Sequence, residues 1–260
     1  MKTDRILVCF FSPTGGTEKV ARLLGAELEK TFKVEYLDMT VPDGKTCALG
    51  AAEAAVFCVP VYGGRVPSPV AERLSRMSGN DTPAALAAVF GNRAVDDALL
   101  ELKNMAAPRG FRTICAGEFV APHSVNPAFG AGRPDGEDMK VIAEMASAFA
   151  EKLKGAESAA AIPQISVPGN PEYRAYDGIP LKPAAGKKCV KCGACAANCP
   201  AGAISKDNPA ATDREKCISC MRCIRVCPRK ARNTPAVMRL VSSVLLGKYC
   251  RGRKDDKIYT

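Results

Sequence analysis

The first 155 residues alternate short runs of consecutive apolar residues with segments in which apolar residues recur every three or four positions. Short apolar runs are typical of strands buried on both faces, and the wider spacing is typical of amphipathic helices. The predicted strands lie near residues 4–11, 33–38, 53–60, 84–91 and 112–120. We therefore predict an α/β domain over residues 1–155, with a doubly wound five-stranded parallel sheet covered by helices on both faces.

The helices are predicted between these strands and after the last of them. The first begins at Thr17 and places apolar residues on one face, namely Val20, Leu23, Leu24 and Leu28. The last does the same with Ile142, Met145, Phe149 and Leu153. Pro67 is predicted to begin the helix after the third strand, and Asn92 to cap the helix that carries Val95, Leu99 and Leu102.

The rest of the chain has a different pattern. Residues 156–186 show no sustained periodicity and contain several prolines, which predicts an extended linker in which Tyr173 and Tyr176 could contact one of the domains. Residues 187–233 form a small cysteine-rich domain, and residues 234–260 form a basic amphipathic helix and tail. The apolar stripe of that helix comprises Val237, Leu240, Val241, Val244 and Leu245. We expect it to pack on the first domain rather than on a membrane surface, and no stretch reaches the roughly 20 apolar residues of a transmembrane span.

A loop suited to phosphate follows the first strand directly. It reads Ser12-Pro13-Thr14-Gly15-Gly16-Thr17 and continues into the first helix. Glycines let backbone N–H groups converge, hydroxyls add donors, and a helix N-terminus favours negative charge. A nucleotide-triphosphate loop would need Gly-Lys-Ser/Thr, a dinucleotide fingerprint would need G-x-G-x-x-G, and a Cys-x5-Arg phosphatase loop would need arginine where Gly15 stands, so these classes are excluded.

Eight of the thirteen cysteines lie in two copies of C-x2-C-x2-C-x3-C-P. The copies are Cys189, Cys192, Cys195, Cys199, Pro200 and Cys217, Cys220, Cys223, Cys227, Pro228. This spacing is typical of proteins with two 4Fe-4S clusters, in which the fourth cysteine of each run binds the other cluster. We therefore expect one cluster on Cys189, Cys192, Cys195 and Cys227, and the second on Cys217, Cys220, Cys223 and Cys199.

Other uses of these cysteines fit less well. Structural zinc needs separated pairs rather than triplets, and disulfide frameworks belong to short secreted chains. The first apolar run, residues 6–11, is shorter than a secretory signal core. We therefore expect a cytoplasmic protein, from an anaerobic host because such clusters are easily oxidised. Cys9, Cys58 and Cys115 lie in apolar runs and are predicted to be buried, while Cys47 and Cys250 are given no role.

The charge is concentrated at one end of the chain. Residues 1–180 carry 19 Lys and Arg against 22 Asp and Glu, a balance of −3, while residues 181–260 carry 18 against 5, a balance of +13. Each all-cysteine 4Fe-4S cluster adds roughly two negative charges, which offsets part of this excess. The remainder could attract an acidic redox partner, dock on the first domain, or be a solvated face. The basic residues concerned include Arg229, Lys230, Arg232, Lys248, Arg251, Arg253 and Lys254.

The first domain resembles the flavodoxins. Residues 12–17 match the FMN phosphate loop of that family, T/S-x-T-G-x-T, at every fixed position. Flavodoxins hold the flavin ring with the loops after the third and fourth strands, which here are Pro60-Val61-Tyr62-Gly63-Gly64-Arg65 and Gly91-Asn92-Arg93. The resemblance implies that residues 12–17, 60–64 and 91–93 bind FMN.

The same resemblance suggests individual roles. It places Tyr62 against the ring and a flexible peptide at Gly63 or Gly64 near the flavin N5. The loop after the fourth strand has no aromatic residue, so a second stacking side chain is missing and that face could be open to a substrate or a cluster. His123, the only histidine, follows the fifth strand at the same edge and is a weak candidate for donating a proton or hydrogen bond.

The order of the two domains resembles that of flavodoxin-ferredoxin fusion proteins of anaerobes, with a small α+β bacterial two-cluster ferredoxin domain after the flavodoxin-like one. The resemblance implies an electron-transfer protein that connects FMN with two 4Fe-4S clusters. Its partner would be a redox protein or a small-molecule donor or acceptor. One alternative is an FMN-dependent reductase of a quinone or an unsaturated metabolite, with His123 or Arg93 orienting the acceptor. Another is a redox sensor that binds nucleic acid, for which the sequence offers no recognition motif.

Overall fold

The computed structural model describes residues 2–260 and contains a parallel sheet at the predicted positions. Its five parallel strands are β1 (Arg5–Phe10), β2 (Val34–Asp38), β4 (Glu53–Pro60), β6 (Thr82–Phe90) and β7 (Phe111–Val120). They lie side by side in the order β7-β6-β4-β1-β2. Numbered only among themselves, these strands have the order 2-1-3-4-5 of the flavodoxin-like doubly wound fold.

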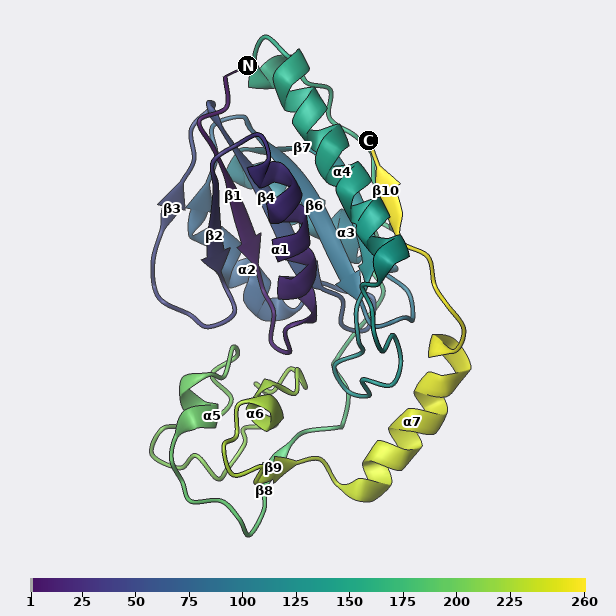
Figure 1. The fold of residues 1–260 in the computed structure, drawn as a ribbon. Coiled ribbons are helices and arrows are strands. Elements are labelled where there is room, and N and C mark those ends of the chain that lie inside the picture. The colour runs from purple at the N-terminus through teal and green to yellow at the C-terminus, as the bar shows by residue number, and fades with distance from the viewer. Residues whose placement is uncertain (1) are drawn as a thin grey trace.

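The sheet has a sixth strand that the sequence pattern did not predict. Strand β10 (Lys257–Tyr259), at the end of the chain, pairs antiparallel with β7 through the register Ile258 to Gly117. In Figure 1 the yellow C-terminal segment returns past the cysteine-rich domain to the edge of the sheet. The last residues are therefore part of the first domain's sheet.

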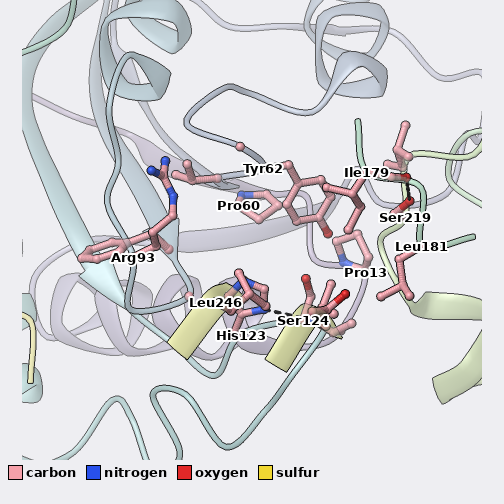
Figure 2. Close-up of a pocket in the computed structure, with 18 of the residues that line it drawn as sticks. Pro13, Pro60, Tyr62, Arg93, His123, Ser124, Ile179, Leu181, Ser219 and Leu246 are labelled. Carbon is pink, nitrogen blue, oxygen red and sulfur yellow. Dashed lines mark hydrogen bonds between the residues drawn. The ribbon is translucent and has the colours of Figure 1, made fainter. Parts of the chain in front are cut away.

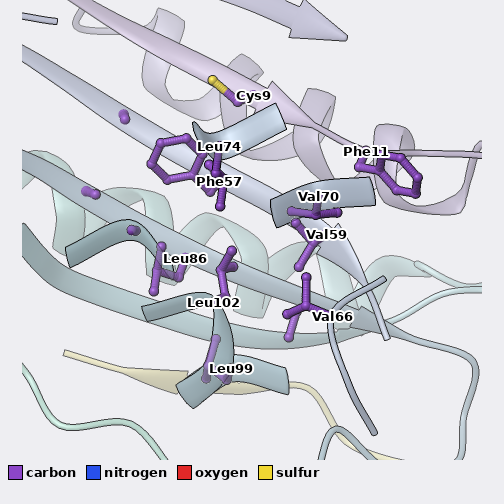
Figure 3. Close-up of a cluster of buried hydrophobic side chains, with 14 of the residues drawn as sticks. Cys9, Phe11, Phe57, Val59, Val66, Val70, Leu74, Leu86, Leu99 and Leu102 are labelled. Carbon is purple, nitrogen blue, oxygen red and sulfur yellow. The ribbon is translucent and has the colours of Figure 1, made fainter. Parts of the chain in front are cut away.

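Helices cover both faces of the sheet, as the periodicity predicts. One face carries α1 (Gly16–Glu29) and α4 (Gly136–Gly155), which bury the predicted apolar positions of the first and last helices. The other face carries α2 (Ser68–Ser75) and α3 (Ala98–Ala106), followed by the 3-10 turn η1 (Ala107–Arg109). Figure 3 shows Val70, Leu99 and Leu102 from these helices packed on Phe57 and Leu86 of the sheet. Burial of this kind is the main stabilising term of the domain.

The cysteine-rich domain lies beyond the carboxyl ends of the parallel strands (Figure 1). It contains the short helices α5 (Ala194–Ala197) and α6 (Arg222–Arg225), and the antiparallel strands β8 (Ala184–Ala185) and β9 (Arg232–Asn233). A second small pair, β3 (Cys47–Ala48) with β5 (Met77–Ser78), lies beside the main sheet and is parallel.

The backbone of the cysteine-rich domain repeats with the cysteines. Left-handed residues occur in three pairs 28 positions apart, namely Lys191 and Ser219, Gly193 and Met221, and Gly202 and Lys230. The N–H of Ala203 donates to Cys199 Sγ and that of Ala231 to Cys227 Sγ, both at 3.2 Å. The two copies therefore share local geometry as well as cysteine spacing.

Residues 156–186 are extended, with only the 3-10 turn η2 (Ala159–Ala161) before β8, and they are held against the first domain. The Ile165 N–H donates to the Thr113 carbonyl at 3.0 Å, and Lys103 Nζ donates to the Ile165 carbonyl at 2.7 Å. The Asp97 carboxylate accepts from the N–H groups of Asn170 and Arg174, both at 2.8 Å. The linker is thus a strap fixed along α3.

Helix α7 (Ala236–Cys250) forms where the C-terminal amphipathic helix is predicted. Most of the predicted stripe is exposed to solvent, with exposed fractions of 72% at Val237, 68% at Leu240 and 61% at Val244. The half-buried residues Met238, Ser242 and Leu246 line a cavity together with Val241 and Leu245 at the edge of the stripe. The expectation that the stripe packs on the first domain is therefore wrong for most of its surface. None of the helices described for residues 2–260 is long and apolar enough to span a bilayer.

The role predicted for Asn92 is also wrong. Helix α3 begins at Ala98 after Asp97, so Asn92 does not cap it. The Asn92 side-chain amide instead donates to the carbonyls of Cys250 at 2.6 Å and Gly252 at 2.8 Å. This residue therefore ties the end of α7 to the carboxyl end of β6.

Candidate functional site

A cavity of about 360 Å³ lies at the carboxyl ends of the parallel strands. The loops after β1, β4, β6 and β7 all contribute to its wall, which is the usual ligand position in an open α/β sheet. The predicted residues that line it are Pro13, Thr14, Gly16, Thr17, Pro60, Val61, Tyr62, Gly63, Gly91, Arg93 and His123. The volume falls within the roughly 300–1,000 Å³ of small-molecule sites. We call it the strand-end cavity.

The loop after β1 has backbone donors to spare. Gly15 has φ 91°, a left-handed conformation that suits glycine, and turns the chain into α1. Ser12 Oγ accepts from the Glu18 N–H at 2.8 Å, and this hydrogen bond ties the loop to the first turn of α1. Within residues 2–260, the N–H groups of residues 14–17 donate to no acceptor of the chain. Convergent free N–H groups at a helix N-terminus fit a phosphate.

The loop after β4 is held in an unusual conformation at its two glycines. Gly63 and Gly64 have φ of 61° and 88°. A Cβ at Gly63 would come within 2.1 Å of the Tyr176 ring, and one at Gly64 within 2.2 Å of the Asp96 carboxylate. Both positions therefore require glycine for space as well as for backbone conformation.

Tyr62 lies in the strand-end cavity, with its ring beside Pro60 in Figure 2. Burial raises the pKa of Tyr62 well above its ordinary range, and the nearby thiol of Cys220 and phenol of Tyr176 act in the same direction. The phenol is therefore neutral at physiological pH, and it lies close to a cysteine of the second domain.

Three segments that sequence reasoning did not assign to the site complete the cavity wall. The strap contributes Tyr176, Ile179 and Leu181, the cysteine-rich domain contributes Ile218 and Ser219, and α7 contributes Met238, Ser242 and Leu246 among others. Figure 2 shows Ile179, Leu181 and Ser219 on one side and Leu246 near His123. These residues form a part of the wall that the sequence did not predict. No local motif marks them, because they reach the site only through the tertiary fold.

His123 lines the cavity as a neutral ring. Burial lowers the pKa of His123 to about 4, and the positive charge of Arg93 acts in the same direction. Its Nδ1 accepts from the Val125 N–H at 3.1 Å, so the ring proton belongs on Nε2. The residue is suited to donating a hydrogen bond and poorly suited to donating a proton at neutral pH.

Not every predicted cofactor residue faces the cavity. Ser12, Gly15, Gly64 and Asn92 are not among its lining residues. Ser12 and Asn92 use their side chains for the structural contacts described above. Arg93 does line the cavity, and its guanidinium is paired with Asp96.

The structure gathers the eight patterned cysteines around two small cavities, each of about 20 Å³. One is lined by Cys217, Cys220, Cys223 and Cys199, and the other by Cys189, Cys192, Cys195 and Cys227. Each set combines one triplet with the fourth cysteine of the other copy. Among residues 2–260, no group of three or more His, Cys, Asp or Glu side chains is placed to hold a single metal ion.

The two cysteine cavities lie at different distances from the strand-end cavity. The first shares Ile218 with it, and we call this the proximal cysteine cavity. The second shares no lining residue with it, and we call this the distal cysteine cavity. Burial raises the pKa of Cys220 to about 12 and that of Cys223 to about 11. At neutral pH these proximal thiols are therefore protonated and become thiolates only when a metal binds.

Arginines of the cysteine-rich domain hold it against the loop after β1. Arg222 Nη1 donates to the Pro13 carbonyl at 3.3 Å, and Arg225 Nη2 donates to the Thr14 carbonyl at 3.3 Å. From the other side, Arg73 Nη2 of α2 donates to the Pro200 carbonyl at 2.9 Å. The same loop that offers N–H groups to the cavity therefore offers its carbonyls to the second domain.

The remaining cysteines lie outside these sites. Cys9, Cys58 and Cys115 have exposed fractions of 0%, as the apolar runs predict. Burial raises the pKa of Cys115 to about 11 and those of Cys9 and Cys58 further. They are unreactive core residues.

Comparison with known proteins gives a family for the second domain. Residues 188–232 match the family model of the 4Fe-4S dicluster domain. No curated protein sequence matches the chain.

Three similar solved structures each cover a little over half of this chain. An archaeal flavodoxin is 15% identical, over 58% of this chain and 99% of that chain, with a TM-score of 0.42. The flavodoxin of Streptococcus pneumonia TIGR4 is 18% identical, over 57% and 99%, with a TM-score of 0.41. An apo NADH:FMN oxidoreductase is 12% identical, over 56% and 88%, with a TM-score of 0.41. The strand order, rather than these similarities, identifies the fold as flavodoxin-like.

Proposed function

We propose that the chain is an iron-sulfur flavoprotein that transfers electrons between two 4Fe-4S clusters and FMN. One observation carries the proposal: Ile218 and Ser219, which lie between the cluster cysteines Cys217 and Cys220, also form part of the wall of the strand-end cavity. The proposed flavin site and the proximal cysteine cavity therefore share a wall one loop thick.

The residues of the strand-end cavity fit FMN. The free N–H groups of residues 14–17, with the hydroxyls of Thr14 and Thr17, would hold the phosphate. Residues 60–63 and Gly91 would border the ring, with Tyr62 on one side. Tyr176 of the strap supplies an aromatic side chain that the loop after β6 lacks. FMN supplies chemistry that accepts or gives one or two electrons, and the protein adjusts its potential through these contacts.

The cysteines fit two clusters with crossed ligation. Cys217, Cys220, Cys223 and Cys199 would hold the proximal cluster, and Cys189, Cys192, Cys195 and Cys227 the distal one. The N–H groups of Ala203 and Ala231 already donate to the sulfurs of Cys199 and Cys227, which are the residues that cross between copies. Hydrogen bonds to ligand sulfurs of this kind tune cluster potential.

The lining of the cavity favours an electron carrier over a reductase of an organic acceptor. A reductase needs a free flavin face, and here the strap, the proximal cysteine loop and α7 cover part of the cavity. Neutral His123 provides no proton donor at physiological pH, and Arg93 is paired with Asp96. Domain bounds near residues 155, 186 and 233 fit this proposal, with the last residues returning to the first domain.

The test is anaerobic reconstitution with iron, sulfide and FMN, followed by reduction of the clusters with a low-potential donor. We expect about one FMN and two 4Fe-4S clusters per chain, and flavin absorbance that falls after cluster absorbance. The Cys220→Ser variant should lose this internal transfer, whereas Cys47→Ser, outside both cysteine cavities, should keep it. Clusters that are reduced while the bound flavin stays oxidised for many minutes would rule the proposal out.

A further inference from the structure

The two cysteine cavities differ in the charge of their linings. Among the described residues that line the proximal cavity, no lysine, arginine, aspartate or glutamate occurs. The distal cavity is lined by Lys191, Arg229 and Arg232. Each set has one buried cysteine, Cys195 or Cys220, and Cys192 of the distal set is the one exposed cysteine of the eight. The distal set therefore reaches the surface at Cys192.

A basic patch surrounds this exposed cysteine. We define the distal patch as Lys187, Lys188, Val190, Lys191, Arg229 and Lys230, all of which are exposed. In the part of the chain that the structure describes, none of its lysines or arginines forms an ion pair. Val190, 58% exposed, supplies an apolar surface beside Cys192. The patch thus has an apolar residue within a group of unpaired positive charges.

Several other basic residues of this end of the chain are used inside the protein. Arg232 is 2% exposed and donates to the carbonyls of Pro209 and Ala211. Arg222 and Arg225 contact the loop after β1, and Arg253 pairs with Asp135. The sequence therefore overstates the free basic surface, and the distal patch is the part of it that adjoins a cysteine cavity.

We propose that the distal patch is the docking surface for an acidic redox protein. This inference rests on the proposed function and adds the position and charge of the partner. The proximal cavity already adjoins the strand-end cavity, so the opposite end of the pair is free for exchange with a partner. One electron leaves the reduced partner and enters the cluster that Cys189, Cys192, Cys195 and Cys227 would hold, with no bond made or broken.

The physical form of the patch suits a short-lived redox encounter. Weak electron-transfer complexes have small interfaces, and opposite charges raise their association rates by roughly 10 to 1,000-fold at low salt. Val190, within this charged group, provides apolar surface from which water would be excluded when the partner binds. Nucleic acid fits less well, because residues 187–233 contain no aromatic side chain on which a base could stack.

Binding and electron transfer can be measured with an acidic plant-type ferredoxin as the probe. Binding is titrated by calorimetry with the cluster- and FMN-loaded protein, both partners oxidised so that no electron moves. The rate is then measured by stopped flow with reduced ferredoxin at several salt concentrations. The test variant is Lys187→Gln with Lys188→Gln, two patch residues that do not line the distal cavity, and the control is Arg109→Gln with Lys140→Gln, which removes the same charge from exposed sites in η1 and α4.

We expect the Lys187/Lys188 variant to weaken binding and to slow reduction by about tenfold at low salt, with the control unchanged. The wild-type rate should fall as salt increases, while reduction by the small donor dithionite should be alike in all three proteins. Equal effects of the two double variants, or a rate independent of salt, would overturn the docking proposal. So would binding of a short DNA duplex that the Lys187/Lys188 change abolishes while leaving ferredoxin binding intact.

These outcomes separate the docking proposal from the proposed function. If dithionite reduces the flavin faster in the wild type than in Cys220→Ser, internal transfer holds whatever the ferredoxin does. If dithionite reduces the clusters alone, the proposed function fails even when ferredoxin binds at the distal patch. Iron and FMN contents of each variant exclude loss of cofactor as the cause.

Discussion

At the residue scale, His123 of the strand-end cavity makes the stability of the protein depend on pH. Burial, and to a smaller extent the charge of Arg93, lowers the pKa of His123 to about 4 from an ordinary value near 6.5. Between pH 4 and pH 6.5, His123 is therefore protonated in the unfolded chain and neutral in the folded chain. Stability contributed by the neutral ring is therefore complete above pH 6.5 and is lost as the pH falls toward 4. The same shift keeps His123 from acting as a general acid at pH 7.

The pH effect can be isolated with His123→Asn, which retains a side-chain acceptor for the Val125 N–H. We expect the wild type to lose about 2 kcal/mol of unfolding free energy between pH 7 and pH 5 that the variant does not lose. Anaerobic urea unfolding at the two pH values, followed by circular dichroism, gives the difference. Equal losses in the two proteins would show that His123 does not titrate as proposed.

The duplicated backbone predicts the effect of a single glycine. Lys230 has φ 48° and is exposed, while its counterpart 28 positions earlier, Gly202, has φ 61°. A side chain in this left-handed region costs about 1 kcal/mol or more. Lys230→Gly should therefore raise the apparent melting temperature of the loaded protein, whereas Lys230→Ala should not, although both remove the same charge.

The mirror substitution checks this argument. Gly202→Ala should lower the apparent melting temperature, because it places a Cβ where the first copy has none. Calorimetry of the loaded protein under anaerobic conditions measures all three variants. A Lys230→Ala protein as stable as Lys230→Gly would mean that the backbone relaxes at this position.

At the scale of elements, the strap forms part of the wall of the strand-end cavity. Tyr176 both lines the strand-end cavity and packs on Gly63, whereas Tyr173, in the same strap, contacts Asn104 and Arg65 outside it. If Tyr176 contacts the flavin ring, Tyr176→Ala should weaken FMN binding about tenfold and Tyr176→Phe should leave it nearly unchanged.

Quenching of FMN fluorescence on binding gives these affinities. The matched control is Tyr173→Ala, which removes an aromatic ring from the strap but not from the cavity. If Tyr173→Ala weakens binding as much as Tyr176→Ala, the effect comes from loosening of the strap and the proposed ring contact is wrong.

The C-terminal segment depends on Asn92. Its side chain holds the carbonyls of Cys250 and Gly252, and strand β10 follows a few residues later. Asn92→Gly keeps a residue that tolerates φ 60° but removes these two hydrogen bonds and the one that Asn92 Oδ1 accepts from the Lys254 N–H at 3.3 Å. We expect faster hydrogen exchange in α7 and β10, with α1 and α4 unchanged, and a loss of about 1–3 kcal/mol in local stability.

The sequence predicts those parts of the site that are local in the chain. The loop of residues 12–17 and the cysteine spacing are recognisable because neighbouring residues supply the ligand groups. Tyr176, Ile218 and Leu246 are not recognisable, because they lie in segments joined to the cavity only by docking of the strap, the second domain and α7. Strand β10 was missed for a related reason: three residues have too short a pattern to predict pairing with β7.

At the scale of the whole molecule, the loop after β1 connects the first domain to the cysteine-rich domain through hydrogen bonds. Arg222 and Arg225 donate to its carbonyls, while Thr14, Gly16 and Thr17 of the same loop line the strand-end cavity. A single loop thus contacts both the proposed flavin site and the domain that carries the patterned cysteines. The geometry between the proximal cysteine cavity and the strand-end cavity should therefore depend on these two arginines.

The variant Arg222→Gln with Arg225→Gln tests this dependence. We expect electron transfer from the clusters to FMN to slow by about tenfold or more, since small displacements of reacting groups have large effects on rate. FMN and iron contents should remain, and small-angle X-ray scattering should show a larger radius of gyration as the second domain separates. Stopped-flow absorbance after reduction of the clusters measures the rate.

Arg214→Gln with Lys216→Gln is the matched control, because it removes two exposed charges from the same domain that do not contact the loop after β1. Unchanged scattering with a slower rate in the Arg222/Arg225 variant would place the effect in local electrostatics rather than in docking. An unchanged rate would show that the arginines do not set the relation between the two cavities. A loss of both compactness and rate, with cofactors retained, is the result that docking requires, since the cofactor ligands themselves are left intact.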